Sequence, residues 1–369
     1  SMTNQSSQYQ LDTSYECSHE AGELFEDMAV QLRASSAQIG MAQVMRLRSA
    51  DVYRVDSVCA IASPCSAVAA APATGVPLTT IAAIARRVSD AADLGAVVDA
   101  ILSSFDHAML LLKEGDRLVT IGTRGYARSG IGSEVAIGAG VIGTAAAERR
   151  PVRVSDLSRI RRFGSAVDAS VAEENRTRTI ALPGMADAMS QIALPMVAHG
   201  KLKGVLFLES PDRLAFSHYD ETALALLAAQ AAAIVALSEG EAAEAQPAEP
   251  STAAPPSSGA EPFRVVHYSY DDSVFIDNEY LIKGVAGRLL MYLLRAHLRE
   301  GRTEFTNREI RLANGLRLPE IKDNLETRLL LLRRRLEEKV APIQLARTGR
   351  GRIRLELAKP ALLEEPTLD

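Results

Sequence analysis

The chain of 369 residues contains no tryptophan, and its other aromatic residues make up only 5% of the sequence. It has three cysteines, Cys17, Cys59 and Cys65. So small and odd a number argues against a disulfide-stapled secreted domain, and we expect a reducing, cytoplasmic compartment. Apolar residues still make up 47% of the chain, which is ample for buried cores.

The sequence also lacks features that several classes of protein function require. No apolar run approaches the roughly 20 residues that a membrane-spanning helix needs, so we expect no membrane segment. Cysteines and histidines lack the paired spacing of metal sites, and no glycine-rich loop ends in Lys-Ser or Lys-Thr. We therefore expect neither a metal nor a cofactor, and we do not expect an enzyme.

Composition divides the chain into segments. Residues 240–262 are rich in Pro, Ala, Ser and Glu and lack large apolar residues, which is typical of a flexible linker. Residues 18–48 suggest a helix, read equally well as a coiled-coil seam or as an ordinary amphipathic helix. We predict an N-terminal tail that includes this helix (1–75) and a first domain of mixed strands and helices (76–239). The linker (240–262), a second domain (263–358) and a C-terminal tail (359–369) follow.

The second domain carries a helix-turn-helix pattern. Thr306 and Glu309 have the spacing of a capping box, which predicts a helix start. Asn314-Gly315 breaks this helix, and Pro319 opens the next one. Apolar residues then recur on one helix face, at Ile321, Leu325, Leu329, Leu332 and Leu336.

A basic hairpin follows the second helix. Alternating apolar residues on both sides of Gly349-Arg350-Gly351 predict two strands joined by a glycine turn. Residues 263–357 hold 19 Lys and Arg against 13 Asp and Glu, in a chain whose net charge is −5. A basic module on an acidic chain indicates a polyanionic partner.

Residues 263–357 resemble the effector domain of OmpR-type response regulators, a winged helix-turn-helix. Residues 263–268, 273–276 and 279–282 supply its short strands, and 289–298 its first helix. Leu332-Arg333-Arg334-Arg335-Leu336 resembles the family's R-L-R-K-K-L. Leu331 departs from it, because the family usually has a basic residue there, and Arg352 replaces an aromatic residue. Four consecutive leucines, residues 329–332, suggest that this helix buries more of itself than usual.

The resemblance implies binding to double-stranded DNA, with the second helix in the major groove. Base contacts are expected from the exposed face of residues 320–335, and phosphate contacts from the helix end and the hairpin. The expected DNA-binding residues are Lys322, Asn324, Thr327, Arg328, Arg333, Arg334, Arg335, Arg347, Arg350 and Arg352. The alternative is a winged helix that makes protein contacts, with residues 329–332 in the interface.

Residues 76–239 resemble a GAF domain. The matching motifs, in the family's order, are Gly138–Gly143, Pro151–Asp156, Ala193–Met196, Gly204–Ser210 and Phe216–Asp220. The three glycines at 138, 140 and 143 are expected to serve a tight turn and a close helix approach. The fold class expected for the whole chain is therefore α+β, with a GAF-like antiparallel sheet and helices followed by a C-terminal winged helix-turn-helix.

The GAF resemblance implies small-ligand sensing, or dimerisation where the pocket is filled. Helices expected at 78–105 and 217–238 would pair across a two-fold axis. Ligand-binding candidates are Asp156, Arg176, Arg178 and Gln191, with the arginines holding an anion or simply forming a solvated helix face. His107 near the pocket is a candidate haem or metal ligand, but a single histidine at the start of a strand more often has a structural role.

These observations together predict a cytoplasmic, homodimeric transcriptional regulator with a GAF-like sensor and a DNA-binding winged helix. The alternative is a signalling scaffold whose winged helix contacts a protein partner.

Overall fold

The computed structural model describes residues 76–158, 174, 177–241, 261–313, 321–349 and 351–366. The chain divides into two compact units, Ser1–Gly75 and Val76–Asp369, and the described residues all belong to the second. The helix expected at 18–48, most of the linker, and Arg176 and Arg350 lie outside the described residues. The expected segment boundaries stay predictions. Two regions are named below as the central part, residues 76–241, and the C-terminal part, residues 261–366.

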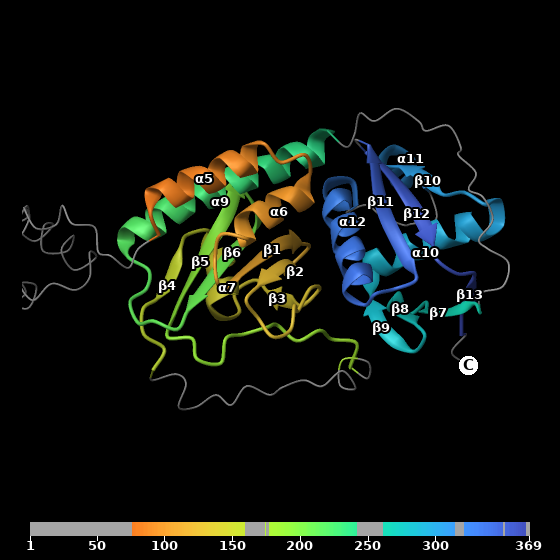
Figure 1. Cartoon of the computed structure of the whole chain (residues 1–369), viewed down its shortest axis with the longest axis horizontal. Coiled ribbons are helices and arrows are strands. Elements are labelled where there is room, and N and C mark those ends of the chain that lie inside the picture. Colours follow the sequence, from red (N-terminus) through yellow and green to blue (C-terminus); the bar gives the residue numbers. More distant parts are fainter. Residues whose placement is uncertain are drawn as a thin grey trace, which may run out of the picture. The chain divides into compact units, whose positions relative to one another are not determined.

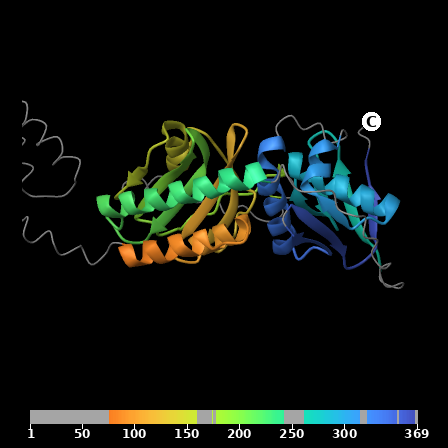
Figure 2. The ribbon, with the colours of Figure 1, turned by 90° about the horizontal axis from the view of Figure 1, so that it is seen from above.

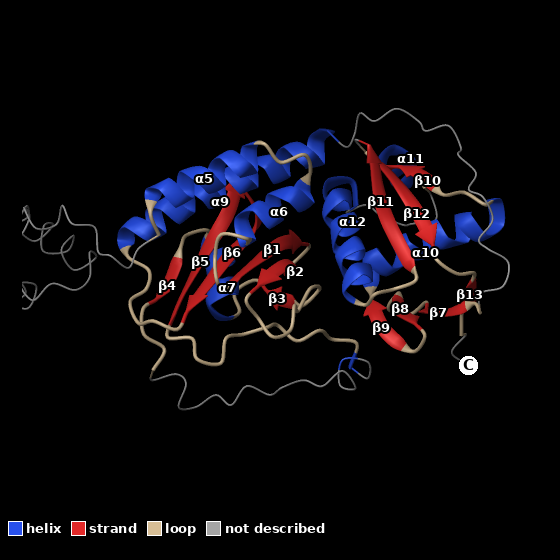
Figure 3. Cartoon of the chain, in the orientation of Figure 1, coloured by secondary structure: helices blue, strands red, loops and turns tan. Residues whose placement is uncertain are grey.

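The central part is built on one six-stranded antiparallel sheet (Figures 1 and 3). Its order is β3-β2-β1-β6-β5-β4. The bounds are β1 Ala108–Glu114, β2 Arg117–Arg124, β3 Glu134–Ala136, β4 Val152–Val154, β5 Ser190–Ala198 and β6 Lys201–Ser210. Alternating or continuous apolar runs between turn residues predict strands at 107–113, 117–122, 152–154, 190–198 and 202–209. Strands β1, β2, β4, β5 and β6 begin and end within two residues of these bounds, and β3 was not predicted.

Three helices cover one face of this sheet: α5 (Leu78–Ser89), α6 (Leu94–Leu102) and α9 (His218–Glu241). Helices α5 and α9 lie side by side (Figure 2), and Gln230 Nε2 donates to Ala85 O at 2.9 Å. The expectation of one helix over 78–105 was wrong, because Asp93 caps a new helix by accepting a hydrogen bond from Ala96 N at 2.8 Å.

Helix α7 (Gly140–Glu148) packs on the opposite face of the sheet, against Met109, Ala193 and Phe207. The turn before it needs glycine. Gly138 has a φ of 93°, and a Cβ on Gly143 would lie 2.3 Å from Ala136 O. The structural role expected for these glycines is confirmed.

Helix α9 corrects the expectation about apolar runs. Residues His218–Ser238 are long and apolar enough to cross a membrane by length and composition. In this structure 39% of that window is buried, with Leu224, Leu227 and Val235 packed in the core over the sheet. The helix is apolar around much of its circumference because small alanines fill most of its remaining positions.

The C-terminal part contains two small sheets (Figure 1). The first has the order β13-β7-β8-β9, with β7 Phe263–Tyr268, β8 Ser273–Ile276, β9 Glu279–Ile282 and β13 Ala361–Glu364. Strand β13 pairs in parallel with β7, so the tail expected at 359–369 instead completes this sheet. The second sheet has the order β10-β12-β11, with β10 Glu304–Thr306, β11 Ile343–Gly349 and β12 Arg352–Leu357.

Three helices pack between these sheets: α10 (Gly284–Glu300), α11 (Asn307–Leu312) and α12 (Ile321–Glu338). Thr306 caps α11, since its hydroxyl accepts from Glu309 N at 3.2 Å, as expected. The predicted helix pair and the predicted hairpin β11–β12 are therefore confirmed as elements. Helix α12 also contacts α6, α9 and β2 of the central part.

Candidate functional site

Helix α12 carries most of the residues expected to bind DNA, and it packs against the central part. Leu329, Leu330, Leu331 and Leu332 are all buried. An apolar run of this length cannot face solvent on a helix without a large cost in exposed surface. The expectation that this helix buries more of itself than usual is confirmed. The leucines are covered within the chain rather than left open for another protein.

Two arginines of α12 are almost completely buried. Arg328 is 1% exposed, and its Nε lies 2.9 Å from Glu114 Oε1 at the end of β1. Arg335 is also 1% exposed and donates to Glu174 Oε1 and Glu338 Oε2, both at 2.8 Å, and to Leu281 O at 2.9 Å. Buried guanidinium groups are stable only when paired in this way.

A third arginine is held by the central part alone. Arg334 donates to Asp99 Oδ1 at 2.7 Å, to Gly95 O at 3.2 Å and to Ile121 O at 3.3 Å. Next to it, Arg333 lies against Gly95, where an added Cβ would come within 2.5 Å of Arg333 Nη2. The surface of α6 therefore admits the Arg333 guanidinium group because position 95 has no side chain.

These contacts correct the expected exposure of the helix. Thr327 and Arg328 were expected on an exposed face, but they are only 4% and 1% exposed. The carboxylates of Asp99 and Glu174 lie beside Arg334 and Arg335, where DNA phosphates were expected. Glu114 lies beside Arg328, which was expected to contact a base. The side chains of Lys322 and Asn324 lie outside the described residues.

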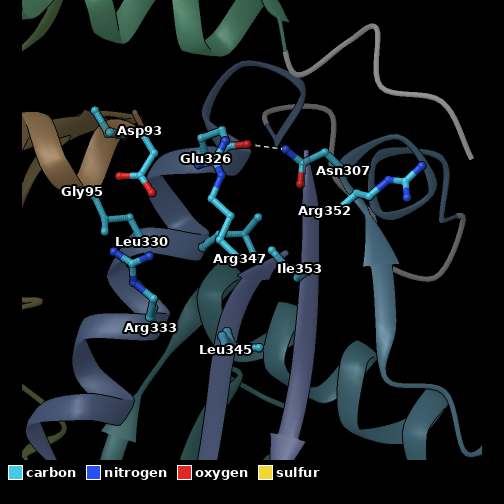
Figure 4. A pocket seen from close by; sticks show the side chains of 12 residues that line it. Asp93, Gly95, Asn307, Glu326, Leu330, Arg333, Leu345, Arg347, Arg352 and Ile353 are labelled. Atoms are coloured by element: carbon cyan, nitrogen blue, oxygen red, sulfur yellow. Dashed lines mark hydrogen bonds and ion pairs between the residues drawn. The ribbon is translucent and has the colours of Figure 1, made fainter. Parts of the chain in front are cut away.

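The hairpin arginines have a different environment. Arg347 and Arg352 are both exposed, although Arg347 Nη1 lies 3.1 Å from Glu326 Oε2. They line a small cavity that is open to solvent, together with Arg333 of α12. Figure 4 shows Asp93 and Gly95 on the other side of this cavity, and the bond from Asn307 to Glu326.

The expected ligand-binding residues do not form one site. Asp156 accepts from Ser158 N at 2.8 Å in its own loop. The Arg178 guanidinium lies 4.5 Å from the Tyr268 ring centroid, and Nη1 is 3.1 Å from Asp271 Oδ2. Arg178 therefore joins the C-terminal part, whereas Gln191 donates to Glu209 Oε1 at 2.7 Å. Sequence reasoning could not predict the roles of Arg178 and Gln191, because their partners lie far away in sequence.

A polar cluster that the sequence analysis largely missed surrounds Gln191. Glu209, at the end of β6, is 7% exposed and also accepts from Met185 N at 3.2 Å. Tyr126 and His107 lie nearby, with ring centroids 5.8 Å apart in an edge-to-face arrangement. Burial raises the pKa of Tyr126 far above its usual value, and the negative charge of Glu209 raises it further.

His107 also belongs to this cluster. Among the described residues, no three His, Cys, Asp or Glu side chains gather closely enough to hold a metal ion. The signal that could have identified the cluster is Glu209 itself, a carboxylate that ends the apolar run Val205–Leu208 on a strand.

Comparison with known proteins identifies the central part. Residues 79–236 match the family model described as GAF domain, which agrees with its antiparallel sheet and its helices on both faces. None of the curated proteins compared with this chain matches it.

Three solved structures are similar to the chain over less than half of its length. The GAF domain from an Acinetobacter phosphoenolpyruvate-protein phosphotransferase is 19% identical, with a TM-score of 0.36, and the match covers 44% of this chain and 94% of that one. The free methionine-R-sulfoxide reductase from Neisseria meningitidis, in complex with its substrate, is 21% identical, with a TM-score of 0.32. The match covers 42% of this chain and 84% of that one. The GAF domain of a Coxiella burnetii phosphoenolpyruvate-protein phosphotransferase is 16% identical, with a TM-score of 0.33, and the match covers 45% of this chain and 98% of that one.

Proposed function

We propose that this chain is a cytoplasmic transcriptional regulator in which the GAF domain senses a small ligand and the C-terminal part binds DNA. The C-terminal part has the element order of an OmpR-type winged helix-turn-helix: a small sheet, three helices and a hairpin. The excess of 19 Lys and Arg over 13 Asp and Glu in residues 263–357 favours a polyanion. In this proposal α12 is the recognition helix and β11–β12 is the wing.

The observation that carries the proposal is the pairing of α12 arginines with carboxylates of the central part. Asp99, Glu114 and Glu174 engage Arg334, Arg328 and Arg335, respectively. DNA phosphates would compete with these carboxylates for the same guanidinium groups. The described arrangement is therefore the DNA-free state of the proposed regulator, and DNA binding requires α12 to leave the central part.

A homodimer is part of the same proposal. Along α9 the exposed residues Tyr219, Leu226 and Leu237 follow a helical spacing and form an apolar stripe. Such a stripe suits a second copy of α9, and a dimer would read two DNA half-sites. Leu226→Glu is expected to convert the dimer to a monomer in light scattering, whereas Leu312→Glu, on exposed α11, leaves the mass unchanged. A wild-type monomer would exclude the dimer.

A second candidate function is a scaffold in which the C-terminal part makes only protein contacts. The burial of residues 329–332 against the central part favours it, because α12 already acts there as a protein-docking surface. In that case the arginines serve only the intramolecular contact, and the chain does not bind DNA.

Selection from a pool of random duplex DNA distinguishes the two functions. The full-length wild type and a Gly95→Leu variant, which is expected to wedge Arg333 away from α6, are tested at two salt concentrations. The regulator is expected to enrich one sequence, with steep salt dependence and tighter binding by the variant. If both proteins bind weakly and without sequence preference, the scaffold replaces the regulator.

A further inference from the structure

The polar cluster around Glu209 lies on the face of the sheet opposite to α5, α6 and α9. Gln191 and Glu209 are direct cross-strand partners of β5 and β6. Because side chains alternate along a strand, they share a face with Ala193 and Phe207, which pack with α7. His107 precedes β1 and joins them, since its carbonyl accepts from Glu209 N at 3.1 Å.

Glu209 is a buried carboxylate with neutral partners. It accepts hydrogen bonds from the Gln191 side-chain amide and the Met185 backbone amide. Among the described residues it forms no ion pair with a lysine or an arginine. A buried carboxylate without a cation is costly, since neutral donors offset only part of the lost hydration. Within the described residues the charge of this carboxylate is therefore not compensated, which favours a positively charged ligand.

Two aromatic side chains lie beside Glu209. His107 Nδ1 is buried and has no hydrogen-bond partner within the described part of the chain, whereas the Tyr126 hydroxyl lies within hydrogen-bonding reach of Glu209. Gly125 holds Tyr126 in this place, because its φ is 84° and a Cβ there would lie 1.9 Å from Asp106 O. The phenol keeps its proton and can donate a hydrogen bond, while both rings offer faces or edges to a ligand.

We propose that this cluster binds a small organic cation, a ligand that carries a protonated primary amine. The ammonium group pairs with Glu209, and the Tyr126 and His107 rings flank it through cation–π and hydrogen-bonding contacts. This inference rests on the proposed function, in which the GAF domain senses a ligand. It reverses the sign of the ligand expected from arginines, because Arg178 is engaged elsewhere.

The cluster is linked to the C-terminal part by two short segments. Tyr126 belongs to the loop that also places Ser129 against Glu338 of α12 and Arg128 3.8 Å from Glu174. Met185 belongs to the segment that starts with Arg178, which contacts β7 and β8. A ligand that displaces the first segment therefore changes contacts of α12 with the central part, and one that displaces the second changes contacts with β7 and β8.

Thermal unfolding with matched ligands tests the site without DNA. The full chain is heated with a set of primary amines (ethylamine, butylamine, putrescine and benzylamine) and with the alcohols of the same carbon skeletons. At saturation we expect at least one amine to raise the Tm by about 2–4 °C, and no alcohol to do so. Glu209→Gln should abolish the shift, whereas Asp156→Asn, an exposed carboxylate control, should retain it.

The unliganded variant provides a second readout. Glu209→Gln removes a buried negative charge and is expected to raise the Tm of the protein without ligand, whereas a purely structural Glu209 would give a lower Tm. Tyr126→Phe keeps the ring and should reduce the shift if Glu209→Gln does not fold. An absent amine shift, or an equal shift in Glu209→Gln, would overturn the proposal. Failure of DNA binding alone would leave this site intact.

Discussion

The arginines of α12 and those of the β11–β12 hairpin are expected to have the same role, but they have opposite environments. Arg328 and Arg335 are each 1% exposed and meet carboxylates of the chain. Arg347 and Arg352 are exposed and line an open cavity. Within one small domain, the arginines of α12 are thus paired with carboxylates of the chain, whereas the arginines of the hairpin are accessible to solvent.

The difference shows which contacts must break before α12 can bind anything else. A surface ion pair such as Arg334–Asp99 contributes about 0–1 kcal/mol because Asp99 is largely exposed. Buried pairs are different, since removing one partner leaves an uncompensated charge. Arg352 of the hairpin needs no such release, whereas Arg347 must first leave Glu326. In our proposal the hairpin provides the first, salt-sensitive contact with DNA, and the helix follows.

The largest expected effect distinguishes two neighbouring arginines of α12. Arg335→Ala should lower the free energy of unfolding by about 3 kcal/mol, because Glu174 loses its nearest buried partner and keeps only the more distant Lys339 and Arg128. Arg333→Ala is the matched control and should cost below about 0.5 kcal/mol, since its pair with Glu337 is half-exposed. Denaturant unfolding of both variants measures this. Equal losses would show that the two sites do not differ as described.

Charge reversal at the central part is expected to have the next largest effect. Glu114→Lys places like charges beside buried Arg328 and should raise the affinity for selected DNA by about tenfold or more, which is about 1.4 kcal/mol. Asp116→Lys makes the same charge change two residues away on an exposed turn, so it controls for simple attraction to DNA. Fluorescence anisotropy of labelled duplexes compares them, and equal gains would refute a specific release of α12.

A smaller effect is expected from the accessible arginine of the hairpin. Arg352→Ala should weaken DNA binding on all sequences alike and reduce the salt slope by about 1, because one phosphate contact is lost. Arg150→Ala removes an exposed arginine of the central part and should change neither quantity. The salt dependence of binding by each variant decides this, and an unaltered slope for Arg352→Ala would remove the residue from the DNA interface.

The smallest expected effect concerns pH. Burial alone would raise the pKa of Asp271, but hydrogen bonds from Ser273 and the nearby Arg178 guanidinium lower it overall. A lowered folded-state pKa means that this carboxylate stabilises the fold above about pH 4 and loses that contribution as pH falls further. Asp271→Asn should reduce the stability difference between pH 7 and pH 3 by below about 1 kcal/mol. Asp187→Asn is the exposed control, and an identical pH profile for wild type and Asp271→Asn would contradict the assignment.

Much of the secondary structure could be predicted from the sequence because it depends on local patterns. Strands β7, β8 and β9 begin and end at the expected residues, since short apolar runs between turn residues are a clear strand signal. The break between α5 and α6 was missed because the Asp93 cap lies inside a continuous apolar periodicity. Strand β13 was missed because only its pairing with distant β7 makes residues 361–364 a strand.

The site residues were harder to predict than the fold because their partners lie far along the chain. Arg334 and Asp99 are 235 residues apart, so no spacing rule connects them. Glu209 and Gln191 are brought together only by the register of β5 and β6. A sequence identifies which arginines are available for a polyanion, but the tertiary structure decides which of them a carboxylate of the same chain already holds.

Hydrogen–deuterium exchange of the full chain, with and without the selected DNA at saturation, tests most directly whether DNA and the central part compete for α12. We predict that DNA increases protection in the β11–β12 hairpin and decreases it in α6 and at the end of β1, where Asp99 and Glu114 lose their arginine partners. Unchanged protection of α6 and β1 in the DNA complex would contradict the account, since α12 would then remain bound to the central part.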